Sequence, residues 1–154
     1  MTENRIKVAK DKARLVKELK ASNDTTGPFQ TYVEVMLFAA AFGAKRKKRV
    51  PLVEIARDLE PIRRDYFDKN KCELVINLLS IFETQEGNVL ADDEKIDEKR
   101  IKIFEEYANG GLEILQDELR GAVDYSERII LILSGERIKE KEQEENFDLS
   151  KFLS

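Results

Sequence analysis

The stretch GPFQTYVEVMLFAAAFGAKRKKR, residues 27–49, decides the predicted fold. No charged residue lies between Glu34 and Lys45, and the stretch then ends in five consecutive cations. A helix that is apolar on every side belongs in a protein core or a membrane, whereas a block of like charge belongs in water or against a polyanion. The longest apolar run, residues 35–44, is only about half of the roughly 20 residues that span a bilayer. The stretch therefore predicts a core helix followed by a basic surface segment.

The flanking residues suggest where this helix begins and ends. Residues 22–27 have the composition of a turn, so Thr26 or Gly27 is expected to cap the helix, with Pro28 at its first position. Gly43 is expected to end it as a left-handed residue, close to cations that favour the negative end of the helix dipole.

Composition limits the class of protein. With 154 residues, 42% of them apolar and 38% charged, the chain is long enough for one domain with a hydrophobic core and a strongly solvated surface. One cysteine and no histidine exclude an internal disulfide, the usual zinc sites and acid–base catalysis by histidine. Cys72 is interpreted as a partly buried structural thiol. The charged N-terminus lacks the apolar centre of a signal peptide, so we expect a cytoplasmic protein without cofactor or metal.

Hydrophobic periodicity predicts a mostly α fold, a compact multi-helix domain with a short N-terminal strand. Residues 4–9 alternate polar and apolar as a strand does, whereas residues 10–22 and 52–59 have helical spacing. The strongest helical pattern covers residues 71–84, where one face carries Leu74, Val75, Leu78, Leu79 and Phe82. This face is expected to pack in the core.

The second half of the chain is also expected to be helical. A helix should start at Asp92 and Asp93, and Gly110 and Gly111 should interrupt it, since each glycine costs about 1 kcal/mol in a helix interior. The aliphatic run within residues 126–134 fits a buried helix or a buried strand, and the neighbouring patterns favour the helix. Helix or strand stays open for residues 61–68 and 128–134.

We divide the chain into one helical domain, residues 1–135, and a charged extension and tail, residues 136–154. The extension has almost no apolar face, so it should be a solvated helix or disordered. The final FDLSKFLS, residues 147–154, has apolar residues that could dock onto a neighbour's groove.

The order strand, helix, helix at the N-terminus has the form of a ribbon-helix-helix unit, in which two chains pair their strands and place outward side chains in the DNA major groove. Arg5 and Lys7 would then reach DNA, while Ile6 and Val8 cover the core. The alternative is that the strand pairs within its own fold or simply frays.

Charge is distributed unevenly. Residues 1–50 hold 12 Lys and Arg against 5 Asp and Glu, a net +7, and the remainder holds 15 against 26, a net −11. The basic run can bind several nucleic-acid phosphates without recognising a base sequence, or it can be an ordinary solvated loop. Together with Arg5 and Lys7, the predicted DNA-binding residues are Lys45, Arg46, Lys47, Lys48 and Arg49.

A cluster of acidic residues lies around the sequence YANGG. Paired carboxylates can bind a divalent cation or act as acid and base, yet on an amphipathic helix they usually form the solvated face. We favour the solvated face and predict neither catalytic residues nor metal ligands among Glu105, Glu106, Glu113, Asp117 and Glu118.

Three strings, RIKVAKDKARLVKELKASNDTTGPFQTY, VMLFAAAFGAKRKKRVPL and IFEEYANGGLEILQDELRGAVDYSERIILIL, resemble the small proteins called DNA phosphorothioation-associated protein 4, encoded beside bacterial Dnd systems. The resemblance covers residues 4–133 and implies a context of sulfur-modified DNA and the defence genes around it. The start of the chain is also similar to the small E subunit of Dnd systems, a compact helical protein that binds DNA through lysines.

From these observations we expect a non-enzymatic accessory protein of a DNA phosphorothioation system, one concerned with phage defence or restriction–modification, that binds the DNA backbone through its basic N-terminal third. The alternative is an interaction or scaffold protein that assembles with Dnd-system proteins, or with its own copy, without touching DNA.

Overall fold

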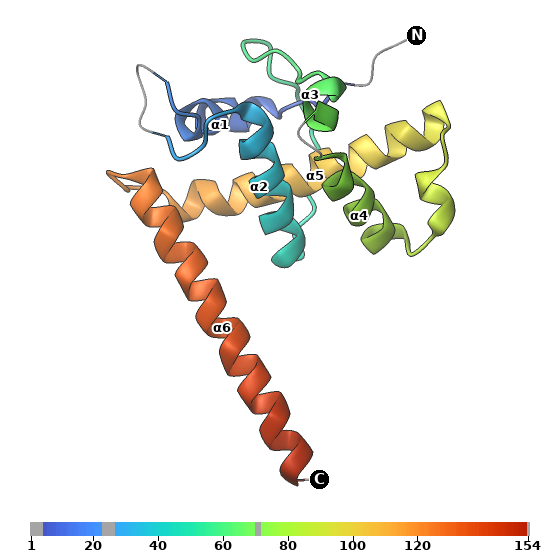
Figure 1. Cartoon of the computed structure of the whole chain (residues 1–154). Helices are drawn as coiled ribbons and strands as arrows, with labels where there is room; N and C mark the ends of the chain where they lie inside the picture. Colours follow the sequence, from blue (N-terminus) through green and yellow to red (C-terminus); the bar gives the residue numbers. More distant parts are fainter. Residues whose placement is uncertain (1–4, 23–26, 70–71, 154) are drawn as a thin grey trace.

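The computed structural model describes residues 5–22, 27–69 and 72–153, with the side chains of residues 68–69 and 145–153 excepted. Its elements follow in the order η1 (Lys10–Lys12), α1 (Ala13–Leu19), α2 (Tyr32–Lys45), α3 (Arg64–Lys69), α4 (Glu73–Thr84), η2 (Gly87–Leu90), α5 (Glu94–Glu118) and α6 (Tyr125–Leu153). Figure 1 shows α2 crossing α5, with α1 on one side of the crossing and α4 on the other. The predicted mostly α fold is confirmed.

The α2–α5 crossing brings two helix backbones into direct contact. A Cβ atom on Gly43 would overlap the carbonyl oxygen of Tyr107, and one on Gly111 would overlap that of Ala39. A Cβ atom on Gly110 would meet the carbonyl group of Lys48, where the chain leaves α2. Each of these glycines therefore serves a close approach of backbone to backbone.

This packing corrects two predictions. Gly43 does not end α2, which continues to Lys45, and the left-handed residue that follows is Lys47, with φ 56°. Gly110 and Gly111 do not interrupt α5, because contact with α2 and the segment after it offsets their helix penalty. The residue that caps α2 is Thr31 rather than Thr26 or Gly27; its hydroxyl accepts from the Glu34 amide at 3.2 Å.

The core is built mainly from α2 and α5. Phe67 of α3 meets Phe104 of α5 edge to face, with ring centroids 5.5 Å apart. The largest fully buried side chains come from both halves of the chain: Phe67, Phe104, Ile6, Leu19, Met36, Ile76, Ile103, Leu112, Leu115, Leu119, Val8 and Val16.

The N-terminal segment pairs inside its own chain. Ile6 and Ile62 exchange two backbone hydrogen bonds of 2.8 Å, the Ala56 amide donates to Val8, and the Lys10 amide donates to Glu54. These are isolated antiparallel bridges, and no strand forms among the described residues. The backbone edge that a two-chain ribbon needs is thus used by residues 54–62; Asn4, at the start of the predicted strand, lies outside the described residues.

Pairing with the N-terminal segment also explains why residues 52–59 are not the predicted short helix. Their backbone is held extended or turned by the bonds to Val8 and Lys10, and their apolar residues Ala56 and Leu59 are buried from this irregular chain. Of the segment left open, residues 61–68, the part from Arg64 onward is helical in α3.

Helix α4 forms where the periodicity predicts it, but it buries a different face. Ile76, Leu79 and Ser80 are buried against the body, whereas Leu74, Leu78 and Phe82 are exposed by 63%, 55% and 54%. The predicted core face was therefore wrong for three of its five residues.

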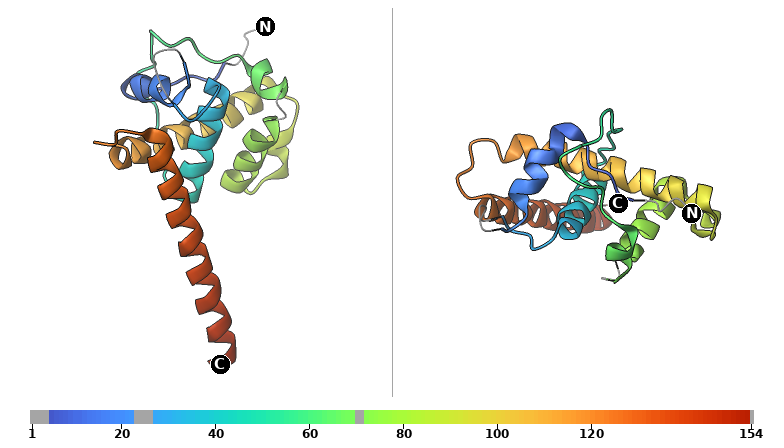
Figure 2. Two further views of the ribbon diagram at one scale, coloured as in Figure 1. Left: turned by 60° about the vertical axis from the view of Figure 1, so that its left-hand side comes forward. Right: turned by 90° about the horizontal axis from the view of Figure 1, so that it is seen from above.

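Helix α6 includes the aliphatic run, which is helical as favoured, and continues past Gly135, with exposed side chains over residues 137–144. Of this run Ile129 is buried and Ile132 half-buried, while Ile130, Leu131 and Leu133 are exposed. Figure 1 and the left view of Figure 2 show α6 extending away from the rest of the chain. This helix runs without a break through residue 135, where the sequence predicts a boundary. The side chains expected to dock, in residues 147–154, lie outside the described part. No described helix has the length and apolar character to cross a membrane.

The glycine contact predicts a stability defect. Gly111→Ala should lower the free energy of unfolding by about 1–3 kcal/mol, because the added methyl group forces the α2 and α5 backbones apart. Urea unfolding followed by circular dichroism measures the change. Gly135→Ala is the matched control: it lies within α6, nothing stands within 4 Å of its added Cβ, and it should leave stability unchanged or raise it by about 1 kcal/mol. Equal stability of Gly111→Ala and the natural protein would contradict the close approach.

Candidate functional site

The basic segment, residues 45–49, follows directly from the end of α2 and lies against acidic helices. Lys45 pairs with Glu140 and, at 3.8 Å, with Glu136 of α6. Arg46 contacts Glu136 as well and reaches Glu118 of α5 at 3.4 Å. The guanidinium group of Arg46 also lies 4.9 Å from the centre of the Phe42 ring. The first two cations therefore join the end of α2 to the middle of α6 and to the end of α5.

The left-handed turn at Lys47 directs the next two cations along α5. Lys48 pairs with Glu113 at 3.5 Å, and Arg49 pairs at 2.8 Å with both Glu106 of α5 and Glu83 of α4. Lys47 itself is exposed, and within the described part of the chain no carboxylate lies at ion-pair distance from it. Four of the five predicted phosphate-binding cations thus have carboxylate partners in the same chain.

Arg49 belongs to a small polar group with Glu83 and Tyr107. The Tyr107 hydroxyl donates a hydrogen bond to Glu83. This bond, aided by Arg49, holds the pKa of Glu83 below its ordinary value although partial burial opposes it. Burial raises the pKa of Tyr107 to about 12, and the carboxylate of Glu83 adds to the rise. The group ties α4, α5 and the basic segment together through charge and hydrogen bonds.

Arg5 and Lys7 lie on the extended N-terminal segment and contact other parts of the chain. Arg5 pairs with Glu60 at 3.1 Å, and the backbone amide of Lys7 donates to Glu105. The Lys7 residue is otherwise exposed. The structure does not join these two residues to Lys45 and Arg46, whose partners are on α6 and at the end of α5. Contact of any of the seven residues with DNA stays a prediction.

The acidic residues around YANGG act chiefly as partners for the basic segment. Besides the pairs already described, Asp117 pairs with Arg120 at 3.2 Å. Among the described residues, no group of three or more histidine, cysteine, aspartate or glutamate side chains is arranged to hold a metal ion. The expected solvated face is wrong for Glu105 and Glu106, which are buried to 7% and 6% exposure. Cys72 is half-buried as expected, and burial raises the pKa of its thiol.

Glu105 is unusual because its carboxyl group is buried and has no cationic partner among the ion pairs of the described residues. Burial raises its pKa to about 7; the Lys7 amide opposes the shift and the charge of neighbouring Glu106 adds to it. Near pH 7 this carboxyl group is therefore partly protonated, and it accepts the Lys7 amide that holds the N-terminal segment beside α5.

A solvent-facing apolar surface on α4 was missed by the sequence interpretation. We call it the α4 strip, and it consists of Leu74, Leu78, Ile81 and Phe82, which are exposed by 37–63%. Their spacing of four, seven and eight residues places them on one side of the helix. The signal was present in the sequence, since seven of the twelve residues of α4 are large and apolar, more than one buried face requires.

Comparison with known proteins gives one match. The family model described as DNA sulphur modification system-associated protein 4 matches residues 5–152, nearly the whole chain. This confirms the family resemblance. Neither a curated protein nor a solved structure matches the sequence.

The ion pairs of Arg46 predict a structural role for this residue. Arg46→Ala should lower the free energy of unfolding by about 1–3 kcal/mol, because Glu136, whose side chain is only 10% exposed, loses its guanidinium partner. The exposed Lys47→Ala is the control and should change stability by less than about 0.5 kcal/mol. Chemical unfolding of both variants measures the difference, and equal stabilities would show that the Arg46 pairs contribute nothing.

The raised pKa of Glu105 predicts a pH-dependent stability. The folded chain holds this proton more tightly than the unfolded chain, so the contribution of Glu105 is complete below pH 4.5 and is lost as the pH rises to about 7. Glu105→Gln keeps an acceptor for the Lys7 amide but cannot ionise. As the pH rises from 4.5 to about 7, the free energy of unfolding of this variant should increase by about 3 kcal/mol relative to that of the natural protein. Unfolding titrations across this range measure it, with Glu98→Gln on the exposed side of α5 as the control.

Proposed function

This chain belongs to the family of DNA sulphur modification system-associated protein 4, and from that premise we propose that it is a non-enzymatic accessory protein that binds another protein of such a system through the α4 strip. The family places the chain with DNA sulphur modification systems, which supports an accessory role. The binding surface is argued from the geometry of α4.

The single observation that carries the proposal is the exposure of four large apolar side chains on one side of one helix. Scattered exposed apolar residues are normal on protein surfaces, but a contiguous set on one helix face is typical of an interaction site. The opposite side of α4 is fixed to α5 by buried Ile76 and Leu79, so the strip is held on a packed helix rather than on a free segment. A packed helix presents these side chains on a backbone that has little conformational entropy left to lose on binding.

The occupant we propose is an amphipathic helix of a partner protein, with an apolar stripe flanked by basic residues. Such a helix can place its side chains at the same spacing as Leu74, Leu78 and Phe82. The only charged residues of α4 are Glu73 and Glu83, and exposed Glu86 follows its end. Glu73 and Glu83 already pair with Arg64 and Arg49 of the same chain, so the preference for lysine or arginine on the partner rests on Glu86. The strip itself carries no cation, so it does not suit the DNA backbone.

The non-enzymatic part of the proposal is supported by the sequence and by the ion pairs. The chain has no histidine, and Glu106, Glu113 and Glu118 are engaged by Arg49, Lys48 and Arg46. In this proposal the basic segment serves chiefly to join α2, α5 and α6, and DNA contact through residues 45–49 is the competing hypothesis.

Charge inserted into the α4 strip should abolish partner binding. We expect Leu78→Glu combined with Phe82→Glu to weaken the complex at least tenfold, because two carboxylates would be desolvated against an apolar helix. The chain is co-expressed with the proteins of its DNA sulphur modification system, each tagged in turn, and the affinity of the co-purified component is measured by calorimetry.

The matched control is Val53→Glu combined with Val123→Glu, two fully exposed apolar residues outside the strip, which should leave binding unchanged. Light scattering tests the other occupant. If the chain dimerises and the strip variant alone becomes a monomer, the strip binds a second copy instead. Undiminished binding of the strip variant to the system's protein would overturn the proposal.

A further inference from the structure

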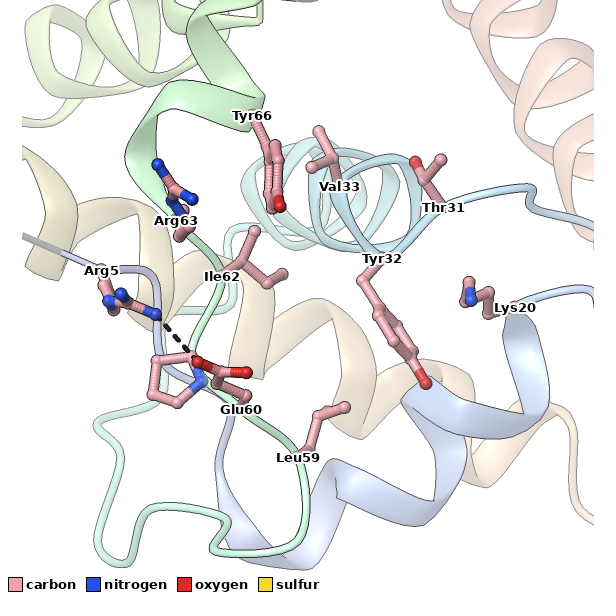
Figure 3. Close-up of a pocket in the computed structure, with 11 residues that line it drawn as sticks. Arg5, Lys20, Thr31, Tyr32, Val33, Leu59, Glu60, Ile62, Arg63 and Tyr66 are labelled. Atoms are coloured by element: carbon pink, nitrogen blue, oxygen red, sulfur yellow. Dashed lines mark hydrogen bonds and ion pairs between the residues drawn. The ribbon is translucent and has the colours of Figure 1, made fainter.

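A cavity lies where the N-terminal half of the chain closes on itself. It has a volume of about 450 Å³ and is formed by the N-terminal segment, the end of α1, the start of α2, residues 59–63 and α3. Figure 3 shows Tyr32 of α2 and Tyr66 of α3 among its walls. Reciprocal backbone hydrogen bonds between Ile6 and Ile62 hold two of these distant segments together.

The cations around this cavity already have contacts within the chain. Arg5 and Arg63 each pair with a carboxylate at 3.1 Å, and the ammonium group of Lys20 lies 4.8 Å from the centre of the Tyr32 ring. Each of the three cations has a further interaction as well. The cavity therefore offers no unpaired cation to a ligand.

A second feature is the uncovered side of helix α6. With 29 residues the helix is about 44 Å long, and it leaves the rest of the chain in Figures 1 and 2. Ile129 and Glu136 are buried and Ile132 is half-buried, so one side of its first half faces the other elements. Lys45 and Arg46 pair with the same part of the helix.

The opposite side of α6 carries residues at alternating spacings of four and three. We call them the α6 seam, and they are Glu127, Leu131, Ser134, Ile138 and Lys141. This spacing is that of the a and d positions of a coiled coil. With about 3.6 residues per turn, the seam points away from the side that holds Ile129 and Glu136. Leu131 and Ile138 are exposed by 60% and 58%, and the other three members are exposed as well.

The middle of the α6 seam is open to a second backbone. Ser134 is small, and beside it nothing stands within 4 Å of a Cβ atom added to Gly135. Two small residues between Leu131 and Ile138 let another helix approach closely, with the larger apolar side chains packed on either side of the crossing.

The charges of α6 are arranged symmetrically about this middle. Glu127 lies seven residues before Ser134 and Lys141 lies seven residues after it; Arg128 and Glu142 have the same relation to Gly135. All four charged side chains are exposed, and within the described residues none has an ion-pair partner.

This symmetry selects the orientation of a matching helix. In an antiparallel pair of α6 helices, Glu127 of each copy meets Lys141 of the other, and Arg128 meets Glu142. In a parallel pair, each of these residues would meet its own copy and repel it. The α6 seam is therefore complementary to itself only in the antiparallel orientation.

We propose that two copies of this chain pair through their α6 seams as antiparallel helices. Ser134 of each copy lies near the two-fold axis, and Leu131 and Ile138 pack between the helices. A helix of another protein could cover the apolar residues, but it would not account for opposite charges placed symmetrically about Ser134. The α6 seam is separate from the α4 strip, and the proposal does not rest on the protein partner proposed above.

The apolar part of the seam is tested by sedimentation of the full chain over a range of concentrations, which should show a monomer and dimer in equilibrium. Ile138→Glu should raise the dissociation constant at least about tenfold, because it places a carboxylate between the helices. Leu133→Glu is the matched control: it replaces an exposed aliphatic residue of α6 outside the seam and should leave the dimer unchanged. Circular dichroism verifies that both variants fold.

The orientation is tested by exchanging charges. Glu127→Lys should weaken the dimer, because the new lysine meets Lys141 of the second copy. Adding Lys141→Glu restores opposite signs and should recover the affinity, which a parallel pair would not do. The variant of the α4 strip, Leu78→Glu with Phe82→Glu, should remain a dimer. The proposal is overturned if the chain is a monomer at every concentration, if Ile138→Glu dimerises as the natural protein does, or if the exchange of charges fails to restore the dimer.

Discussion

The fold depends on one close approach, the crossing of α2 and α5 at Gly43 and Gly111. Without a Cβ atom on either glycine, the backbone of each helix reaches the carbonyl oxygens of the other. Helix α2 packs against α5 at this crossing and against α1 and α4 elsewhere. It is therefore buried on most sides, as its uniformly apolar sequence requires. Helix α2 ends two residues after this contact, at Lys45, and the basic segment that follows lies beside the acidic side chains of α5.

This arrangement pairs most cations of the basic segment with carboxylates from the acidic part of the chain. The N-terminal third is basic and the remainder acidic, which from the sequence suggests an external polyanion. In the fold, Lys45, Arg46, Lys48 and Arg49 meet glutamates of α4, α5 and α6 instead. An external phosphate at this place would have to compete with carboxylates already at hand, and buried Glu106 and Glu136 would lose their partners.

Local signals predicted the helices well, and the errors arise where tertiary contact overrides them. Asp93 caps α5 as the sequence indicates, because its carboxylate accepts nearby amides. Gly110 and Gly111 were predicted to interrupt the helix, because the sequence shows that glycine destabilises a helix. It does not show the contact with the α2 backbone that compensates. Leu74 and Phe82 fitted a core face because periodicity identifies an apolar side without saying what covers it. The cavity between Tyr32 and Tyr66 could not be predicted at all, since its walls come from segments joined only by long-range backbone bonds.

Helix α3 stands between the α4 strip and the cavity. It supplies Tyr66 to the cavity, and its Arg64 pairs with Glu73 at the start of α4 and with Asp97 of α5. A partner helix that covers the strip next to Glu73 would therefore act on the element that carries one cavity wall. Substitutions at Leu78 and Phe82, one and two turns further along α4, leave that ion pair in place. The two surfaces can thus be altered separately, although α3 gives them a common physical support.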